Sequence, residues 1–192
     1  FWSIQNESRS DTPEGQKLFG ELSALAKQLD DSRLVTMATS CQYKDMCYGF
    51  VDVIGVNCYH GWYQGNKEDW MGELVNLKAH LKDNGFDDKP LIIAEFGASA
   101  FLSDRSFERQ RKYSEEFQAD LIEYIIKLLR DDDQIAGLYV WQYCDIRTAK
   151  LLERPRCYNN KGILDENRKP KLAYHKVREM FALFDEQKYA IT

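Results

Sequence analysis

The stretch Lys89-Pro-Leu-Ile-Ile-Ala-Glu-Phe-Gly97 ends an apolar run with a carboxylate, an aromatic ring and a glycine. Its four apolar residues after Pro90 predict a strand buried on both faces, which is typical of a parallel sheet covered by helices. Because burying a carboxylate is costly, Glu95 is expected to be paired, hydrogen-bonded or placed where the sheet opens to a substrate.

A second strand of this kind begins the chain. Residues 1–5 are apolar and β-prone, and they lead directly into Asn6 and Glu7. The sequence therefore predicts two strands that each end in a glutamate, one near the start of the chain and one near its middle.

Composition limits the classes of protein that this chain can represent. Its 192 residues are 44% hydrophobic, enough for a sizeable core, and no apolar run approaches the roughly 20 residues of a membrane span. The net charge of −5 argues against nucleic acid as a partner. The five cysteines are scattered and lack zinc-site spacing, and the three histidines share no ligand spacing, so no metal is expected.

The cysteine pattern also favours a reducing compartment, and hence the cytoplasm. The chain begins with Phe1 and carries no charged leader or apolar signal core, so we expect a fragment or a processed product. For such a piece the missing leader says nothing about localisation.

Hydrophobic periodicity predicts strands that alternate with helices. Strands are expected at 1–5, 34–38, 49–57, 91–95 and 137–141, and helices at 14–29, 67–84, 106–131 and 171–184. Leucines 18, 22, 25 and 29 mark the apolar face of the first helix. Residues 39–48 are too few for a helical crossover, and 142–170 form a long irregular segment of the kind that is usually functional or disordered.

Alternation of this kind indicates a parallel α/β fold, either doubly wound or a (β/α)8 barrel. The chain has neither a glycine-rich dinucleotide loop nor a P-loop, whereas polar and aromatic residues follow nearly every strand. A barrel has eight strands in about 250 residues. Residues 1–192 are therefore predicted to form the C-terminal part of a TIM barrel, strands four to eight, without its first three β-α units.

Two strand-end glutamates in such a barrel suggest glycoside hydrolysis. In the retaining mechanism one carboxyl group protonates the leaving oxygen while the other attacks the anomeric carbon, with the pair about 5–5.5 Å apart. Burial and the charge of the second carboxylate would help the acid to stay protonated near neutral pH. Asn6, beside Glu7, is suited to hydrogen-bond a sugar hydroxyl.

Four segments carry a resemblance to a known family: Trp2-Ser-Ile-Gln-Asn-Glu7, Asn57-x-Tyr59-x-Gly-Trp-Tyr63, Ala94-Glu-Phe-Gly97 and Trp141. In this order and spacing they resemble the C-terminal half of the catalytic barrel of glycoside hydrolase family 2, whose members are retaining exo-β-glycosidases. The resemblance implies that Glu7 is the acid/base and Glu95 the nucleophile, without a cofactor. It also implies that Asn57, Tyr59, Tyr63 and Trp141 line the sugar subsite.

The substrate is predicted from Asn159-Asn-Lys161-Gly162. In the β-glucuronidases of this family an Asn-x-Lys motif contacts the glucuronate carboxylate, and Asn159 with Lys161 matches it. From residue 147 to 171 there are eight Lys or Arg against three acidic residues, a local excess that would attract an anionic sugar. The glucuronidases usually read Trp-Asn-Phe-Ala-Asp where this chain has Trp141-Gln-Tyr-Cys-Asp145, so a β-galactosidase stays open.

The expected partners are a carbohydrate substrate and the missing N-terminal part of the same protein, with a homo-oligomer possible. Without that part the outer strands would expose unpaired edges, so a fragment that is inactive alone is the rival hypothesis. Trp62 is a candidate to stack on a sugar, whereas Trp70, at helical spacing, is expected in the core.

Overall fold

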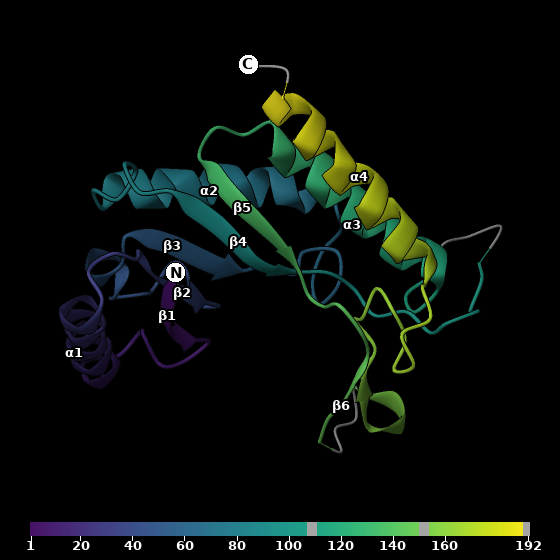
Figure 1. Cartoon of the computed structure of the whole chain (residues 1–192), viewed down its shortest axis with the longest axis horizontal. Helices are drawn as coiled ribbons and strands as arrows, with labels where there is room; N and C mark the ends of the chain where they lie inside the picture. Colours follow the sequence, from purple (N-terminus) through teal and green to yellow (C-terminus); the bar gives the residue numbers. More distant parts are fainter. Residues whose placement is uncertain (107–110, 150–153, 190–192) are drawn as a thin grey trace. The chain divides into compact units, whose positions relative to one another are not determined.

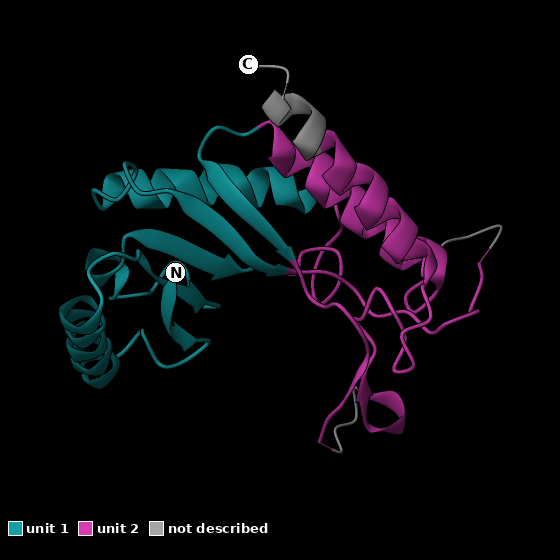
Figure 2. Ribbon diagram, in the orientation of Figure 1, with its two compact units in different colours: residues 1–58, 68–95, 132–139 teal, residues 59–67, 96–131, 140–192 magenta. Residues whose placement is uncertain are grey.

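The computed structural model describes residues 1–106, 111–149 and 154–189. The chain divides into two units, shown in Figure 2. The first comprises residues 1–58, 68–95 and 132–139, and the second comprises 59–67, 96–131 and 140–192.

The sheet of the first unit confirms the predicted α/β architecture. Its strands β1 (Trp2–Asn6), β2 (Val35–Thr39), β3 (Val53–Asn57), β4 (Leu91–Phe96) and β5 (Ile135–Val140) lie in sequence order (Figure 1). The pairs β1–β2, β2–β3 and β3–β4 are parallel. All five residues of β3 are buried, as a strand covered on both faces requires. Neighbouring strands in sequence order are what part of a TIM barrel contains.

The first helix, α1 (Pro13–Leu29), begins where its sequence predicts. Pro13 occupies the first turn, and the Thr12 hydroxyl accepts a hydrogen bond from the Gly15 amide at 3.1 Å. Its buried face differs from the predicted one, because Gly15, Phe19 and Ser23 are buried. The Ser23 hydroxyl donates to the backbone carbonyl of Phe50 at 2.5 Å, an approach that a small side chain permits.

The leucine stripe of α1 is therefore not the face that is buried in this chain. The four leucines are 36–77% exposed: Leu18, Leu22, Leu25 and Leu29. Periodicity located an apolar stripe correctly, but it does not say which side of the helix meets the sheet.

The second helix, α2 (Asp69–Asp83), buries the face that its spacing predicts. Its buried residues are Trp70, Leu74, Leu77 and Leu81. The Trp70, Leu74 and Leu77 side chains share a small internal cavity with Val56 of β3 and Ile93 of β4, so this helix covers the middle of the sheet. Trp70 is 1% exposed, as expected of a core residue.

The crossover from β2 to β3 is short, as predicted, and contains the 3₁₀ helix η1 (Tyr48–Phe50). The predicted strand 49–57 therefore starts too early, since β3 begins at Val53. The Asp52 carboxylate accepts a hydrogen bond from the Val35 amide at 2.8 Å and fixes this entry into the strand.

The second unit contains α3 (Glu115–Arg130) and α4 (Leu172–Tyr189), which pack side by side (Figure 1). One Glu115 carboxylate oxygen accepts from the Leu172 amide at 2.5 Å and ties the two helices together. Between them lie the antiparallel strands β6 (Ile146–Arg147) and β7 (Tyr158–Asn159) and the 3₁₀ helix η2 (Pro155–Cys157). The side chain of Phe184, the last residue of the helix predicted over 171–184, lies outside the described side chains.

The helix predicted over 106–131 starts too early. Residues 107–110 lie outside the described part of the chain, and α3 begins after Ser114, whose hydroxyl accepts from the Phe117 amide at 3.2 Å. Tyr113 instead pairs with Ala100 in an isolated bridge. Among the described residues, no helix has the length and hydropathy that crossing a membrane requires.

Candidate functional site

Glu7 lies immediately after β1 in a left-handed conformation, with φ 49°. Its backbone amide donates to the Ala38 carbonyl at 2.9 Å, so the chain stays attached to β2 as it turns out of the sheet. Left-handed backbone costs a non-glycine residue roughly 1–2 kcal/mol and is concentrated at functional sites.

The Asn57 amide joins Glu7 to Asn6. Its Nδ2 donates to Glu7 Oε1 at 2.8 Å and to Asn6 Oδ1 at 3.1 Å. Asn57 is the last residue of β3 and is 5% exposed. Its side chain thus reaches past β2 to the end of β1, because the parallel strands end at one edge of the sheet.

Glu95 lies next to Asn57 on the neighbouring strand. The register of β3 and β4 pairs Asn57 with Glu95 across a register shift, and the Cys58 amide donates to the Glu95 carbonyl at 2.9 Å. Asn57 therefore contacts one glutamate through its side chain and is the register partner of the other. The first unit brings together four residues that the sequence singled out: Asn6, Glu7, Asn57 and Glu95.

Lys161 is the centre of a second group, which belongs to the second unit. It is only 1% exposed, and its Nζ donates to the Tyr63 hydroxyl at 2.7 Å. The same Nζ lies 4.6 Å from the centre of the Tyr63 ring, 5.3 Å from that of Tyr59 and 5.6 Å from that of Trp62. Aromatic rings attract a cation, so these three rings hold the Lys161 ammonium in position.

Asn159 and Trp141 belong to the same group. The Asn159 side chain accepts from the Lys161 amide at 3.2 Å. Trp141 precedes Gln142, whose amide donates to the Lys161 carbonyl at 3.0 Å and whose side chain donates to the Asn159 carbonyl at 3.3 Å. The peptide bond between Trp141 and Gln142 is cis. The second unit thus brings together Tyr59, Tyr63, Asn159 and Lys161, and Trp141 is one residue before the Gln142 that hydrogen-bonds to this group.

The Tyr63 hydroxyl has a second cationic neighbour that was not singled out from the sequence. The Arg154 guanidinium lies 3.2 Å from the hydroxyl oxygen. Burial alone would raise the pKa of Tyr63, but the hydrogen bonds and charges of Lys161 and Arg154 outweigh it and lower that pKa below 10.0. The local excess of basic residues was the only sequence signal for this contact.

A buried ion pair that hydrogen-bonds to the residue before Lys161 was also not identified from the sequence. Lys171 Nζ lies 2.8 Å from Asp145 Oδ1, and the two side chains are 0% and 3% exposed. Burial raises the pKa of Asp145 despite the hydrogen bond from Lys171, and burial lowers the pKa of Lys171 despite the carboxylate. Both directions show that desolvation is the larger effect on each group.

Trp62 does not support the predicted stacking on a sugar. It is 6% exposed, and its ring packs edge-on against Tyr113 with 5.1 Å between the ring centres. Trp62 therefore has little exposed surface on which a sugar could stack.

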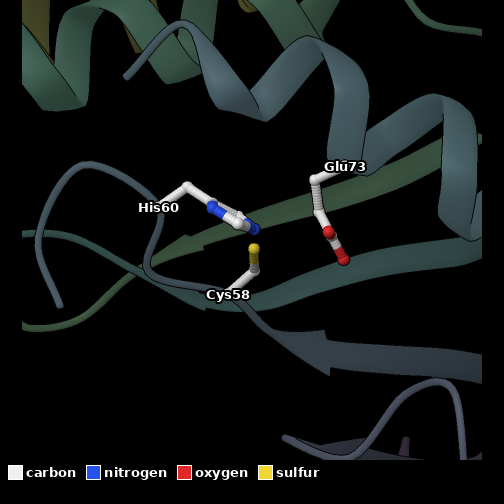
Figure 3. Close-up of side chains that lie close together, drawn as sticks. All are labelled: Cys58, His60 and Glu73. Atoms are coloured by element: carbon white, nitrogen blue, oxygen red, sulfur yellow. The ribbon is translucent and has the colours of Figure 1, made fainter. Parts of the chain in front are cut away.

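Cys58, His60 and Glu73 carry ligand types found in zinc sites, and their side chains are drawn in Figure 3. Cys58 and Glu73 belong to the first unit, whereas His60 belongs to the second. The Glu73 carboxylate accepts hydrogen bonds from Gln42 and from the Tyr43 hydroxyl, both at 2.9 Å. Of these three residues the first unit supplies two, fewer than the three protein ligands of a catalytic zinc site.

Comparison with known proteins identifies the family to which this chain belongs. Residues 1–185 match the family described as glycosyl hydrolases family 2, TIM barrel domain. The pig (Sus scrofa) β-glucuronidase is 31% identical over 196 aligned residues, which cover 98% of this chain and 29% of that protein. The chain thus spans under a third of the length of the curated relatives it matches.

Solved structures show the same similarity. A GH2 β-galacturonidase from Eisenbergiella tayi, bound to galacturonate, has a TM-score of 0.87 and 35% identity over 94% of this chain and 32% of its own. A β-D-glucuronidase from Dictyoglomus thermophilum has a TM-score of 0.86 and 27% identity over 94% and 31% of the two chains. The family match over nearly the whole chain confirms the resemblance read from its motifs, and the chain belongs to the TIM barrel domain family of glycosyl hydrolases family 2.

Proposed function

We propose that the polypeptide containing these residues is a retaining exo-β-glycosidase that hydrolyses β-D-glucuronides. The observation that carries the proposal is the Asn57 amide, which hydrogen-bonds Asn6 and Glu7 while its backbone is in register with Glu95. Two glutamates at one end of a parallel sheet, one hydrogen-bonded to Asn57 and the other its register partner, support the assignment of the carboxyl pair that a retaining glycosidase uses.

In the proposed mechanism Glu7 and Glu95 act in two steps. Glu7 gives its proton to the glycosidic oxygen as the Glu95 carboxylate attacks the anomeric carbon, so the alcohol leaves and a glycosyl ester forms. Glu7 then takes a proton from water, whose oxygen attacks the same carbon and releases Glu95. The net reaction consumes one water and yields a sugar and an alcohol, with neither metal nor cofactor.

The Asn57 amide also suggests which atoms face the substrate. Because its Nδ2 donates a hydrogen bond to Glu7 Oε1, we assign the transferred proton to the other carboxyl oxygen, Oε2. Because Asn57 Nδ2 also donates to Asn6 Oδ1, the Nδ2 of Asn6 is left to donate a hydrogen bond to a sugar hydroxyl.

The Lys161 group supports an anionic sugar. A uronate carboxylate would accept hydrogen bonds from the ammonium and from the Tyr63 hydroxyl, and Asn159 would hold the backbone of Lys161 in place. The Tyr59 and Trp141 rings are assigned to the walls of the sugar subsite. The relatives named above include glucuronidases and a galacturonidase, which act on sugars that carry this carboxylate.

A β-galacturonide is the second candidate substrate, since the galacturonidase structure is 35% identical to this chain. The two sugars share the carboxylate and differ at one hydroxyl, so Lys161 would not distinguish them. A β-galactoside is the third candidate and lacks the carboxylate that Lys161 would bind.

The proposed partner within the polypeptide is the rest of the barrel. The exposed leucine stripe of α1 offers an apolar surface for a neighbouring helix of that part. Self-association through this surface is the alternative.

The test is hydrolysis of p-nitrophenyl β-glucuronide, β-galacturonide and β-galactoside by the complete polypeptide that contains these residues. Glu95→Gln and Glu7→Gln should each abolish turnover, and azide should restore cleavage to the Glu7 variant with retention of configuration. Glu14→Gln, an exposed glutamate on α1, is the matched control and should keep full activity.

Cleavage of the glucuronide with loss in both glutamate variants would support the proposal. An inverted product, or a Glu95→Gln variant with unchanged activity, would refute the mechanism. Preference for the galactoside would refute the uronide assignment.

A further inference from the structure

The loop that carries Lys161 is held from beneath by the buried Asp145–Lys171 pair. We propose that Asp145 and Lys171 are positioning residues that set the backbone of residues 159–162 and thereby place the Lys161 ammonium for the substrate carboxylate. The inference rests on the proposed function and adds two specificity-determining residues to it.

Lys171 has an acceptor for each of its three N–H donors, and one of these acceptors lies in this loop. Its Nζ donates to the Asp145 carboxylate at 2.8 Å, to the Asn160 carbonyl at 3.1 Å and to the Ala100 carbonyl at 2.7 Å. An ammonium with three fixed acceptors cannot rotate to other partners. The Asn160 carbonyl is thereby anchored, one residue before Lys161.

Asp145 fixes the loop on both sides of Lys161. Its Oδ1 accepts from the Gly162 amide at 2.9 Å, and its Oδ2 accepts from the Asn160 side chain at 3.0 Å. Gly162 is close to its neighbours, since an added Cβ would lie 2.1 Å from the Asp145 backbone nitrogen. The backbone on either side of Lys161 is therefore held by the hydrogen bonds that Asn160 and Gly162 form with the buried pair.

The position matters because Lys161 is nearly fully buried and donates to the Tyr63 hydroxyl. A side chain 1% exposed has no room to correct for a backbone shift, and its Nζ must reach Tyr63 at 2.7 Å. Displacements of about 1 Å in positioning groups can cost a factor of 100 in rate.

Stabilisation of the folded state does not by itself explain why the protein buries this ion pair. Burial raises the pKa of Asp145 and lowers the pKa of Lys171, so desolvation opposes the charged form of each group. Replacing a buried ion pair by apolar side chains is often neutral or stabilising. A pair that fixes loop geometry has a purpose that an apolar replacement would not serve.

The experiment is a double-mutant cycle in the complete polypeptide. Asp145→Asn/Lys171→Met removes both charges together, which avoids leaving one buried charge unpaired, and Lys161→Met removes the recognition group. Lys169→Met, an exposed lysine two residues from Lys171, is the matched control. The readouts are kcat and KM on p-nitrophenyl β-glucuronide and amide hydrogen exchange over residues 159–163.

The paired change should lower kcat/KM about 10- to 100-fold, chiefly through KM, and should cost less than threefold when Lys161 is already methionine. Exchange at 159–163 should become faster while β3 and β4 keep their protection, and Lys169→Met should change neither. Equal losses in both Lys161 backgrounds would overturn the inference, since the pair would then act independently of Lys161.

Hydrogen exchange separates this inference from the proposed function. If the unaltered protein cleaves no uronide, the proposed function fails, and the exchange rates at 159–163 still test the loop. Unchanged exchange in Asp145→Asn/Lys171→Met would overturn the positioning role, whatever the substrate. If that variant does not fold, Lys171→Arg is the second variant, and unchanged loop exchange and KM there would equally overturn it.

Discussion

Replacing Lys161 with methionine should remove uronide recognition and leave the fold intact. Methionine keeps an unbranched side chain of similar length, so the apolar contacts with the rings of Tyr59, Trp62 and Tyr63 persist while the charge is lost. A hydrogen bond to a charged group contributes about 1.5–3 kcal/mol. At about 1.4 kcal/mol for each factor of ten, kcat/KM on a β-glucuronide should fall roughly 10- to 140-fold.

The assay compares p-nitrophenyl β-glucuronide with p-nitrophenyl β-galactoside under the same conditions. Activity on the galactoside should change by less than about threefold, since that sugar has no carboxylate to lose. Circular dichroism and the thermal midpoint establish that the variant is folded. Equal losses on both substrates, in a folded variant, would refute the assignment of Lys161 to a substrate carboxylate.

Two further predictions concern Tyr63 and a pair of glycines. Tyr63 should ionise below pH 10, because Lys161 and Arg154 lower its pKa. The ionised hydroxyl therefore stabilises the folded state above pH 10, and this contribution is lost as the pH falls through the folded-state pKa. Ultraviolet titration at 295 nm should move this step to higher pH in Lys161→Met, Tyr63→Phe should lack it, and an unmoved step would contradict the contact. Gly162→Ala should prevent folding, since its Cβ would lie 2.1–2.3 Å from three backbone atoms. By contrast, Gly72→Ala on α2, where an added Cβ would have nothing within 4 Å, should stabilise the protein by roughly 0.8–1 kcal/mol. Urea unfolding and soluble yield measure both effects, and a stable Gly162→Ala protein would contradict the packing at Gly162.

The order of elements was predictable because it depends on neighbours in sequence. The apolar run at 91–94 predicts a buried strand, and β4 occupies Leu91–Phe96. The spacing of Trp70, Leu74, Leu77 and Leu81 predicts a helix and its buried face, and α2 has both. The strand-end positions of Glu7 and Glu95 follow from the same local pattern.

Faces and boundaries were less predictable where a partner far away in sequence decides them. The leucine stripe of α1 looks like a core face, yet Gly15, Phe19 and Ser23 are the buried residues, and the Ser23 hydroxyl hydrogen-bonds to Phe50 of η1. The start of α3 depends on Ser114, whose preceding residue pairs with Ala100. Neither partner can be identified from helical periodicity.

The sequence by itself determined the α/β fold, the family and the identity of the two strand-end glutamates, because burial patterns and motif spacing are properties of short segments. Tertiary structure decided the surroundings of Lys161. Its contact with Tyr63 joins residues 98 positions apart, that of Arg154 with Tyr63 spans 91, and that of Lys171 with Asp145 spans 26. A hydrogen bond requires atoms within about 3 Å, and only the folded chain brings such distant residues to that separation.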